Sequence, residues 1–127
     1  MSQQANQMAM CERHDGVLTV LVLLGEIRDS HTAYAFRDEV IAEMKQATTR
    51  DVIFDLSCVR FIGSVGFLAF LGVRRQLSGG RIVLCNMSDS IREVFQVCRL
   101  IANSDKGAKA PFEEAETLHD ARRMLQR

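Results

Sequence analysis

The spacing of apolar residues along the chain predicts strands that alternate with helices. Residues 9–13 are a plausible short strand, residues 17–24 are rich in apolar and β-branched residues, and His14-Asp15-Gly16 between them is typical of a tight turn. The nearly continuous apolar run of residues 17–24 predicts a buried strand, and residues 51–56 and 81–85 form two more short runs of this kind. The chain is therefore expected to open with a hairpin and to add further strands later.

Four other segments carry apolar residues three and four positions apart, as on one face of a helix. They are residues 30–47, residues 64–77, a segment that follows Ser88, and a last helix after Pro111 that includes Ala115. Ser30 or Thr32 is expected to cap the first helix, and residues 100–103 are a candidate last strand. Strands that alternate with helices imply an α/β fold, with a mixed, largely parallel sheet of four to five strands and about four helices.

Length and composition are those of one folded domain. The chain has 127 residues, of which 47% are hydrophobic, so we expect a tail at residues 1–8, a single domain at residues 9–127 and a loop at residues 103–110. Sixteen basic residues balance sixteen acidic ones, which gives no electrostatic footprint for nucleic acid or an anionic membrane. The apolar runs are shorter than the roughly 20 residues of a membrane span. A cytoplasmic protein is the expectation.

The four cysteines do not form the pairs that a disulfide framework or a zinc site would need. They are Cys11, Cys58, Cys85 and Cys98, and the chain contains no C-x-x-C motif. Three of them lie in or beside apolar segments, so buried, reduced thiols are expected. We predict no metal site and no cofactor.

The segment FIGSVGFLAFLG, residues 61–72, places Ser64 between two glycines at the start of a predicted helix. One interpretation is the nucleophile elbow G-x-S-x-G of a serine hydrolase, with Asp89 or Asp105 and then His119 in the hydrolase order. Ile62 stands where that motif has its first glycine, and no phosphate-binding glycine motif is present either. The plainer interpretation is that Ser64 caps the helix.

A longer stretch, from Val52 to Leu100, resembles the STAS domain, and in particular the anti-sigma factor antagonists of bacteria. Their pattern is a strand, then F-I/M-D-S-S-G-L-G, then a helix that ends near glycine, then a strand and a helix with x-V-x-x-x-F. Here the motif becomes residues 61–67, followed by Gly79-Gly80 and by residues 81–97. The earlier segment GEIRDSHTA also looks like the family's G-E-L-D-x-x-T-A with one residue inserted before Asp29.

The resemblance implies a non-enzymatic signalling protein that binds an anti-sigma factor or a related serine kinase and is released when phosphorylated. In that family the second serine of D-S-S-G accepts the phosphate, and the corresponding residue here is Val65. Valine has no oxygen to phosphorylate, and Gly63 stands where the family has its acid. The usual switch is therefore expected to be altered or lost. Ser64 remains the candidate acceptor, although a shift of one residue turns a helical side chain by roughly 100 degrees.

The predicted partner-binding surface combines the Asp29 turn with the loop and helix around Ser64. Its residues are Asp29, Ser30, Gly63, Ser64, Val65, Gly66, Phe67 and Phe70. The helix is apolar on nearly all sides, more than one buried face requires, so some of Phe67, Leu68 and Phe70 are expected to be exposed as a docking patch. Their burial beneath the loop of residues 57–60 is the alternative. A STAS subunit of a larger assembly, such as a signalling scaffold or a lipid-transport complex, is the second interpretation.

Overall fold

A computed structural model describes residues 7–101 and 110–126 and shows a three-layer α/β fold. The central sheet has five strands in the order β1-β2-β4-β6-β7, in which β1 and β2 are antiparallel and the remaining neighbours are parallel. The strands are β1 (Ala9–His14), β2 (Val17–Val22), β4 (Asp51–Asp55), β6 (Ile82–Cys85) and β7 (Glu113–Ala115). This architecture confirms the predicted fold class.

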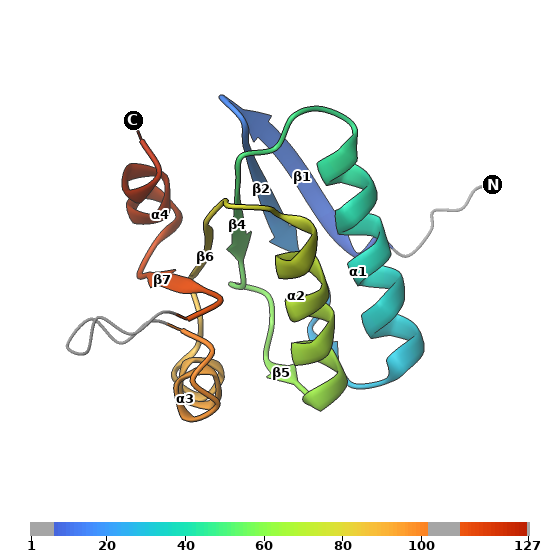
Figure 1. Ribbon diagram of the computed structural model, residues 1–127. Coiled ribbons are helices and arrows are strands. Elements are labelled where there is room, and N and C mark those ends of the chain that lie inside the picture. The colour runs from blue at the N-terminus through green and yellow to red at the C-terminus, as the bar shows by residue number, and fades with distance from the viewer. Residues whose placement is uncertain (1–6, 102–109, 127) are drawn as a thin grey trace.

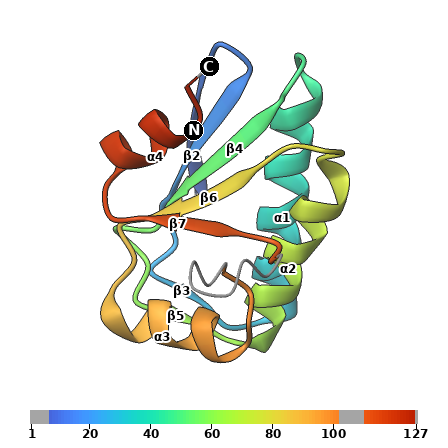
Figure 2. The ribbon, with the colours of Figure 1, turned by 60° about the vertical axis from the view of Figure 1, so that its left-hand side comes forward.

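Helices cover both faces of the sheet. Helices α1 (Ser30–Lys45) and α2 (Ser64–Gln76) lie side by side on one face, and the short helix α4 (Leu118–Met124) lies on the other (Figures 1 and 2). Helix α3 (Asp89–Val97) lies at one end of the sheet, near a separate two-stranded sheet made of β3 (Glu26–Ile27) and β5 (Phe61–Ile62). The predicted tail falls outside the described residues at positions 1–6, and the predicted loop does so at positions 103–109.

The opening hairpin forms as predicted, but its second strand is buried on one face only. Asp15 and Gly16 have φ values of 52° and 79°, as a two-residue hairpin turn requires. Along β2 only Leu18, Val20 and Val22 are buried, and the residues between them are partly exposed. The reason is that the main contacts of α4 fall on β4, β6 and β7. The apolar run of residues 17–24 thus suggested more burial than the fold provides.

Phenylalanine rings fill the core between the sheet and helices α1 and α2. Phe70 lies 4.9 Å from Phe54 and 5.6 Å from Phe36, measured between ring centroids, and both pairs are tilted toward edge-to-face geometry. Phe95 of α3 continues the cluster, with its centroid 6.2 Å from Phe70 and 6.1 Å from Phe112. All five rings are completely buried. This cluster fixes α2 and α3 relative to the sheet.

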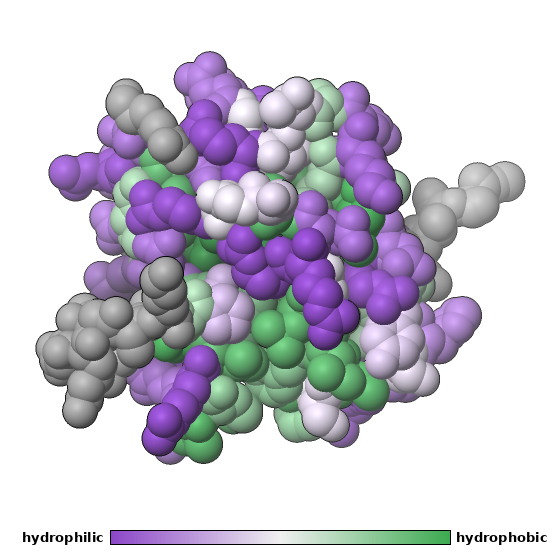
Figure 3. All heavy atoms as spheres, in the orientation of Figure 1, coloured by the Kyte–Doolittle hydropathy of each residue, from purple (hydrophilic) through white to green (hydrophobic). Residues whose placement is uncertain are grey.

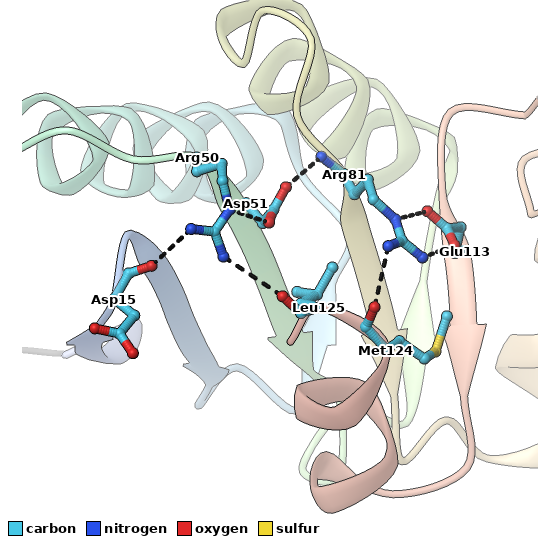
Figure 4. Close-up of polar contacts among 7 residues, drawn as sticks. All are labelled: Asp15, Arg50, Asp51, Arg81, Glu113, Met124 and Leu125. Atoms are coloured by element: carbon cyan, nitrogen blue, oxygen red, sulfur yellow. Dashed lines mark hydrogen bonds and ion pairs between the residues drawn. The ribbon is translucent and has the colours of Figure 1, made fainter. Parts of the chain in front are cut away.

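A polar network holds the other end of the sheet together and anchors α4 (Figure 4). The buried carboxylate of Asp51 accepts hydrogen bonds from Arg50 Nε at 2.8 Å and from the Arg81 amide at 2.9 Å. Arg81 also donates through Nε and Nη2 to both oxygens of Glu113, at 2.8 and 2.7 Å, and through Nη1 to the Met124 carbonyl at 3.0 Å. The hydrogen bond with Glu113 raises the pKa of Arg81. Arg50 also donates through Nη2 to the Leu125 carbonyl at 3.5 Å. Both guanidinium groups therefore bind carbonyls at the end of α4, where cations are favourable.

The carboxyl-terminal elements differ from the prediction. Ile101 forms only an isolated bridge with Phe112, and residues 102 and 103 of the predicted strand lie outside the described residues. The last strand is instead β7, which pairs with β6, and α4 begins only after Thr117, whose hydroxyl accepts from the Asp120 amide. Local sequence favours helix for residues 113–115, but the free edge of β6 offers them backbone partners. Tertiary pairing decided their conformation.

The thiols are all free, but only one of them is buried. Cys85 is buried and Cys11 is half-buried, and burial is the main cause that raises their thiol pKa values to about 12 and about 11, respectively. Cys58 and Cys98 are exposed. The prediction of reduced thiols holds for all four cysteines, and the prediction of burial fails for Cys58 and Cys98, which lie in the loop after β4 and at the end of α3.

Gly80 is expected to be among the least replaceable residues of the fold. A Cβ atom added there would meet the backbone oxygen of Arg50, and two Leu77 side-chain atoms at 2.9 Å. We expect Gly80→Ala to lower the free energy of unfolding by about 1–3 kcal/mol or more, because the neighbouring backbone must move. Urea unfolding followed by circular dichroism measures this. The adjacent Gly79, with a φ of 75° and no atom within 4 Å of an added Cβ, supplies the control Gly79→Asn. A loss at Gly80 no larger than at Gly79 would contradict the prediction.

Candidate docking site

The starts of helices α1 and α2 are joined by the small sheet of β3 and β5. The two strands are parallel, with Glu26 opposite Phe61 and Ile27 opposite Ile62. The Gly63 amide extends the pairing and donates to the Ile27 carbonyl at 2.8 Å. Because Ile27 and Ile62 are both buried, this sheet is firmly attached to the core. It brings the Asp29 turn and the loop at Gly63 together, as the sequence predicted for one surface.

Asp29 is the N-cap of α1. Its carboxylate accepts from the Thr32 amide at 2.6 Å and from the Thr32 hydroxyl at 3.1 Å, an arrangement typical of helix capping. These two hydrogen bonds hold the pKa of the Asp29 carboxyl below its usual range, and the bond from the amide has the larger effect. The prediction that Ser30 or Thr32 caps the helix is therefore wrong. Ser30 is the first helical residue and is exposed, while Thr32 supplies the donors.

The start of α2 lacks a side-chain cap. Its N-cap is Gly63, whose carbonyl accepts from the Gly66 and Phe67 amides at 2.9 and 3.3 Å. Ser64 follows as the first helical residue and is exposed. The prediction that Ser64 caps this helix is wrong, because the chain enters the helix one residue earlier than serine's preference for caps suggested. The Ser64 hydroxyl makes no hydrogen bond within the described part of the chain and faces solvent.

Val65 and Gly66 serve packing. Val65 is partly buried and packs against the main core. Gly66 is buried, and a Cβ added to it would lie 2.5 Å from Ile62 Cγ2 and 3.1 Å from Ile27 Cγ2. Glycine at 66 therefore lets α2 approach the small sheet closely. Gly63 is less constrained, since its added Cβ would make only ordinary contacts at 3.5 Å or more.

The outward face of α2 is apolar at its centre. Leu68 is 52% exposed, and Val65, Phe67 and Leu71 are partly buried around it. In Figure 3 the green apolar surface gathers over the amino-terminal part of α2, and hydrophilic residues cover its carboxyl-terminal end. Leu68, one of the three residues considered for an exposed docking patch, thus occupies the centre of this surface.

The two phenylalanines predicted to contact a partner differ in position. Phe67 is partly exposed and lies over α3, with its ring centroid 4.8 Å from that of Phe95. Phe70 has no exposed surface and lies at the centre of the aromatic core, so it supports the helix from within and is not available for contact. Helical spacing identifies the buried face of α2, because its buried residues recur three and four positions apart; they are Gly66, Ala69, Phe70 and Val73.

Phe61 and Arg28 add a feature to this surface that the sequence did not reveal. Phe61 is 40% exposed, and Arg28 Cζ lies 4.3 Å from its ring centroid, in cation–π geometry. Arg28 Nε also donates to Glu26 Oε1 at 2.8 Å, and this hydrogen bond lowers the pKa of the Glu26 carboxyl. A strand of two residues carries no usable periodicity, so only the alternation of Phe61 outward and Ile62 inward in the folded sheet identifies the site.

The residues of the hydrolase interpretation do not come together. His119 lies in α4 on the opposite side of the sheet from α2, Asp89 lies at the start of α3, and Asp105 lies outside the described residues (Figure 2). Across residues 7–101 and 110–126, no group of three or more histidine, cysteine or acidic side chains could hold a metal ion. None of the helices in this part of the chain is long and apolar enough to cross a bilayer.

Residues 8–115 match the model of the STAS domain. The chain belongs to the STAS domain family. The match includes all the elements of the docking site, from the Asp29 turn through β5 and α2 to α3. It agrees with the motif order read from the sequence.

Relatives of known name narrow the class within the STAS family. BtrV of Bordetella bronchiseptica, provisionally named an anti-sigma factor antagonist, is 31% identical over 111 residues, which cover 82% of this chain and 93% of BtrV. The chain is therefore an anti-sigma factor antagonist-like STAS protein. This class is non-enzymatic, so the hydrolase interpretation is wrong.

Solved structures of this class share the fold. An anti-sigma factor antagonist from Mycobacterium paratuberculosis superposes with a TM-score of 0.71 at 29% identity, over 92% of each chain. The anti-sigma factor antagonist SpoIIAA in its unphosphorylated form gives 0.65 at 22% identity, over 92% of this chain and 96% of SpoIIAA. Bacillus SpoIIAA in its phosphorylated form gives 0.64 at 24% identity, over 93% and 99%.

Proposed function

We propose that this STAS domain binds an anti-sigma factor, or a related kinase-type regulator, through the outward face of α2 and the adjoining start of α1. The observation that carries the proposal is the exposed Leu68 beside the two helix starts that β3 and β5 hold together. An exposed apolar side chain surrounded by partly exposed ones is typical of a protein interface. Ser30, Gly63, Ser64 and Phe67 border this surface, and Asp29 shapes it by capping α1.

The proposal includes a phosphorylation switch that is lost at residue 65. Val65 offers no hydroxyl, and its partial burial against the core gives this position a packing role. SpoIIAA has been solved in phosphorylated and unphosphorylated forms, so a protein of the same fold accepts a phosphate. Without an acceptor at 65, binding here is constitutive or is controlled in another way.

Ser64 is the alternative acceptor. It is exposed in the first turn of α2, where the free amides of a helix start favour a phosphate. Ser64 and Leu68 are four residues apart and share one face of the helix, so a charge of about −1.5 to −2 would appear one turn from the apolar centre. A kinase aligned for residue 65 would reach a side chain that points elsewhere. We therefore expect inefficient transfer to Ser64.

The experiment combines binding with phosphate transfer. The purified protein is incubated with anti-sigma kinases encoded in the same genome and with ATP, and complex formation and intact mass are measured. We expect a stable complex and an unchanged mass for the natural protein. The double variant Gly63→Asp/Val65→Ser carries the D-S-S-G motif and is expected to gain one phosphoryl group. Aspartate fits at 63, because an added Cβ there makes only ordinary contacts. Stoichiometric transfer to Ser64 of the natural protein would mean that the switch survives in shifted form.

The competing assignment is a subunit of a larger assembly that needs no phosphorylation. Affinity capture from the native cell distinguishes the two assignments. Recovery of a transporter ATPase without any anti-sigma factor would favour the assembly and would contradict our proposal.

A further inference from the structure

The charge of the chain is unevenly distributed along its length. Its sixteen acidic residues balance its sixteen basic ones, yet no aspartate or glutamate occurs between Asp55 and Asp89. This acid-free stretch contains β5, α2 and β6, together with Arg60, Arg74, Arg75 and Arg81. Helix α2 therefore contributes only positive side-chain charge to the surface around Leu68.

Two of these arginines are free to bind a partner. Arg75 is exposed in the last turn of α2, seven residues from Leu68 and hence on the same face. Arg60 is exposed immediately before β5, next to Phe61, and its charge is a lesser cause that lowers the pKa of the Glu26 carboxyl, after Arg28. Within the described part of the chain, the guanidinium groups of both residues make no hydrogen bond or ion pair, whereas Arg74 donates to the Leu77 carbonyl and Arg81 binds Glu113.

Three acidic residues, on β3, at the N-cap of α1 and within α1, have hydrogen-bond partners. Glu26 is bound to Arg28 at 2.8 Å. Asp29 is bound by the Thr32 amide and hydroxyl. Asp38 accepts from Arg37 Nε at 3.0 Å. On β3, β5, α2 and the facing part of α1, the arginines without an ion-pair partner among the described residues, Arg60, Arg74 and Arg75, therefore outnumber the unneutralised carboxylate of Asp29. The exposed acids of the neighbouring α3, Asp89 and Glu93, lie beyond Phe67.

We infer that this surface takes an acidic amphipathic helix of its protein partner, with apolar side chains on Leu68 and Phe61 and carboxylates on Arg60 and Arg75. The apolar centre favours a protein segment over a nucleic acid. The charged backbone of a nucleic acid would offer Leu68 and Phe61 no apolar contact. Arg28 Cζ lies 4.3 Å from the centroid of the Phe61 ring, and exposed aromatic and arginine side chains are the residue types that often dominate interface energies. The inference rests on the proposed function for the location of the surface and adds the chemistry of the partner.

The test uses two synthetic helical peptides with leucines at the same positions and either glutamate or lysine at all others. The isotope-labelled full chain is titrated with each peptide at low salt, and backbone amide shifts are followed by NMR. We expect the glutamate peptide to shift the amides of β5 and α2 and to bind at least about tenfold more tightly than the lysine peptide. The double variant Arg60→Glu/Arg75→Glu should reverse that preference.

The matched control is Arg123→Glu, which reverses an exposed arginine of α4 on the other face of the sheet and should leave the preference unchanged. Equal affinities for the two peptides, failure of both to bind, or shifts confined to other elements would overturn the inference. Binding of a single-stranded oligonucleotide at α2 in place of the glutamate peptide would do the same. If the glutamate peptide binds at α2 but no anti-sigma factor does, the proposed function fails and the acidic specificity of the surface stands.

Discussion

Replacing Leu68 with aspartate is expected to weaken binding of the anti-sigma factor by at least about 30-fold, which corresponds to a loss of ~2 kcal/mol or more. The reason is that Leu68 is 52% exposed at the centre of the apolar surface of α2, so a carboxylate there would be desolvated without a partner in the complex. Isothermal titration calorimetry with the purified anti-sigma factor measures the loss. Fold stability should change by less than about 1 kcal/mol, since the site is on an exposed helix face.

Met10 provides the matched control. It is 53% exposed, nearly the same as Leu68, but lies in β1 at the edge of the sheet, away from α2. Met10→Asp should therefore leave binding unchanged. Equal losses for the two variants would mean that the apolar surface of α2 is not the docking site, and unchanged binding by Leu68→Asp would have the same meaning.

Replacing Phe70 with alanine is expected to be the most destabilising single change, with a loss of about 3–5 kcal/mol in the free energy of unfolding. Phe70 is completely buried and contacts the rings of Phe36, Phe54 and Phe95. The cavity would lie where α1, α2, α3 and β4 meet, so the surrounding structure cannot close it without moving several elements. A loss of this size is a large part of the roughly 5–15 kcal/mol that stabilises a domain.

Chemical unfolding monitored by circular dichroism measures this effect, and Phe61→Ala is the control of the same residue type. Phe61 is 40% exposed, so its removal should cost clearly less stability than the removal of Phe70. Phe61→Ala should in turn weaken binding of the anti-sigma factor more than Phe70→Ala does, because Phe61 borders the docking surface and Phe70 is buried. A Phe70 variant as stable as the Phe61 variant would contradict the packing described here.

The sequence predicts the position of the docking site but not which of its side chains are exposed. The motif around Ser64 located the loop and the helix correctly, because glycines and a serine at a helix start are local features. Which of Phe67, Leu68 and Phe70 faces solvent depended on how α2 is rotated about its axis. That rotation is set by the close contact of Gly66 with Ile62 and by the aromatic core, and both involve residues that are distant in the sequence or in other elements.

The caps show the same limit at the level of one hydrogen bond. Asp29, Ser30 and Thr32 are all residue types that cap helices, and the choice among them followed from the backbone as it leaves β3. At Gly63 the pairing with Ile27 fixed the start of α2 one residue before Ser64. The capping preference of a residue type does not include this constraint, because the constraint comes from a neighbouring strand.

The sequence by itself determined the order of the main elements, the α/β class and the family resemblance, since apolar periodicity and turn residues act over a few neighbouring positions. The tertiary structure alone decided that β2 is buried on one face, that residues 113–115 pair with β6, and that Leu68 is exposed while Phe70 is not. Each of these outcomes depends on which surface another element covers. Burial is a property of the assembled layers, and local sequence carries it only in part.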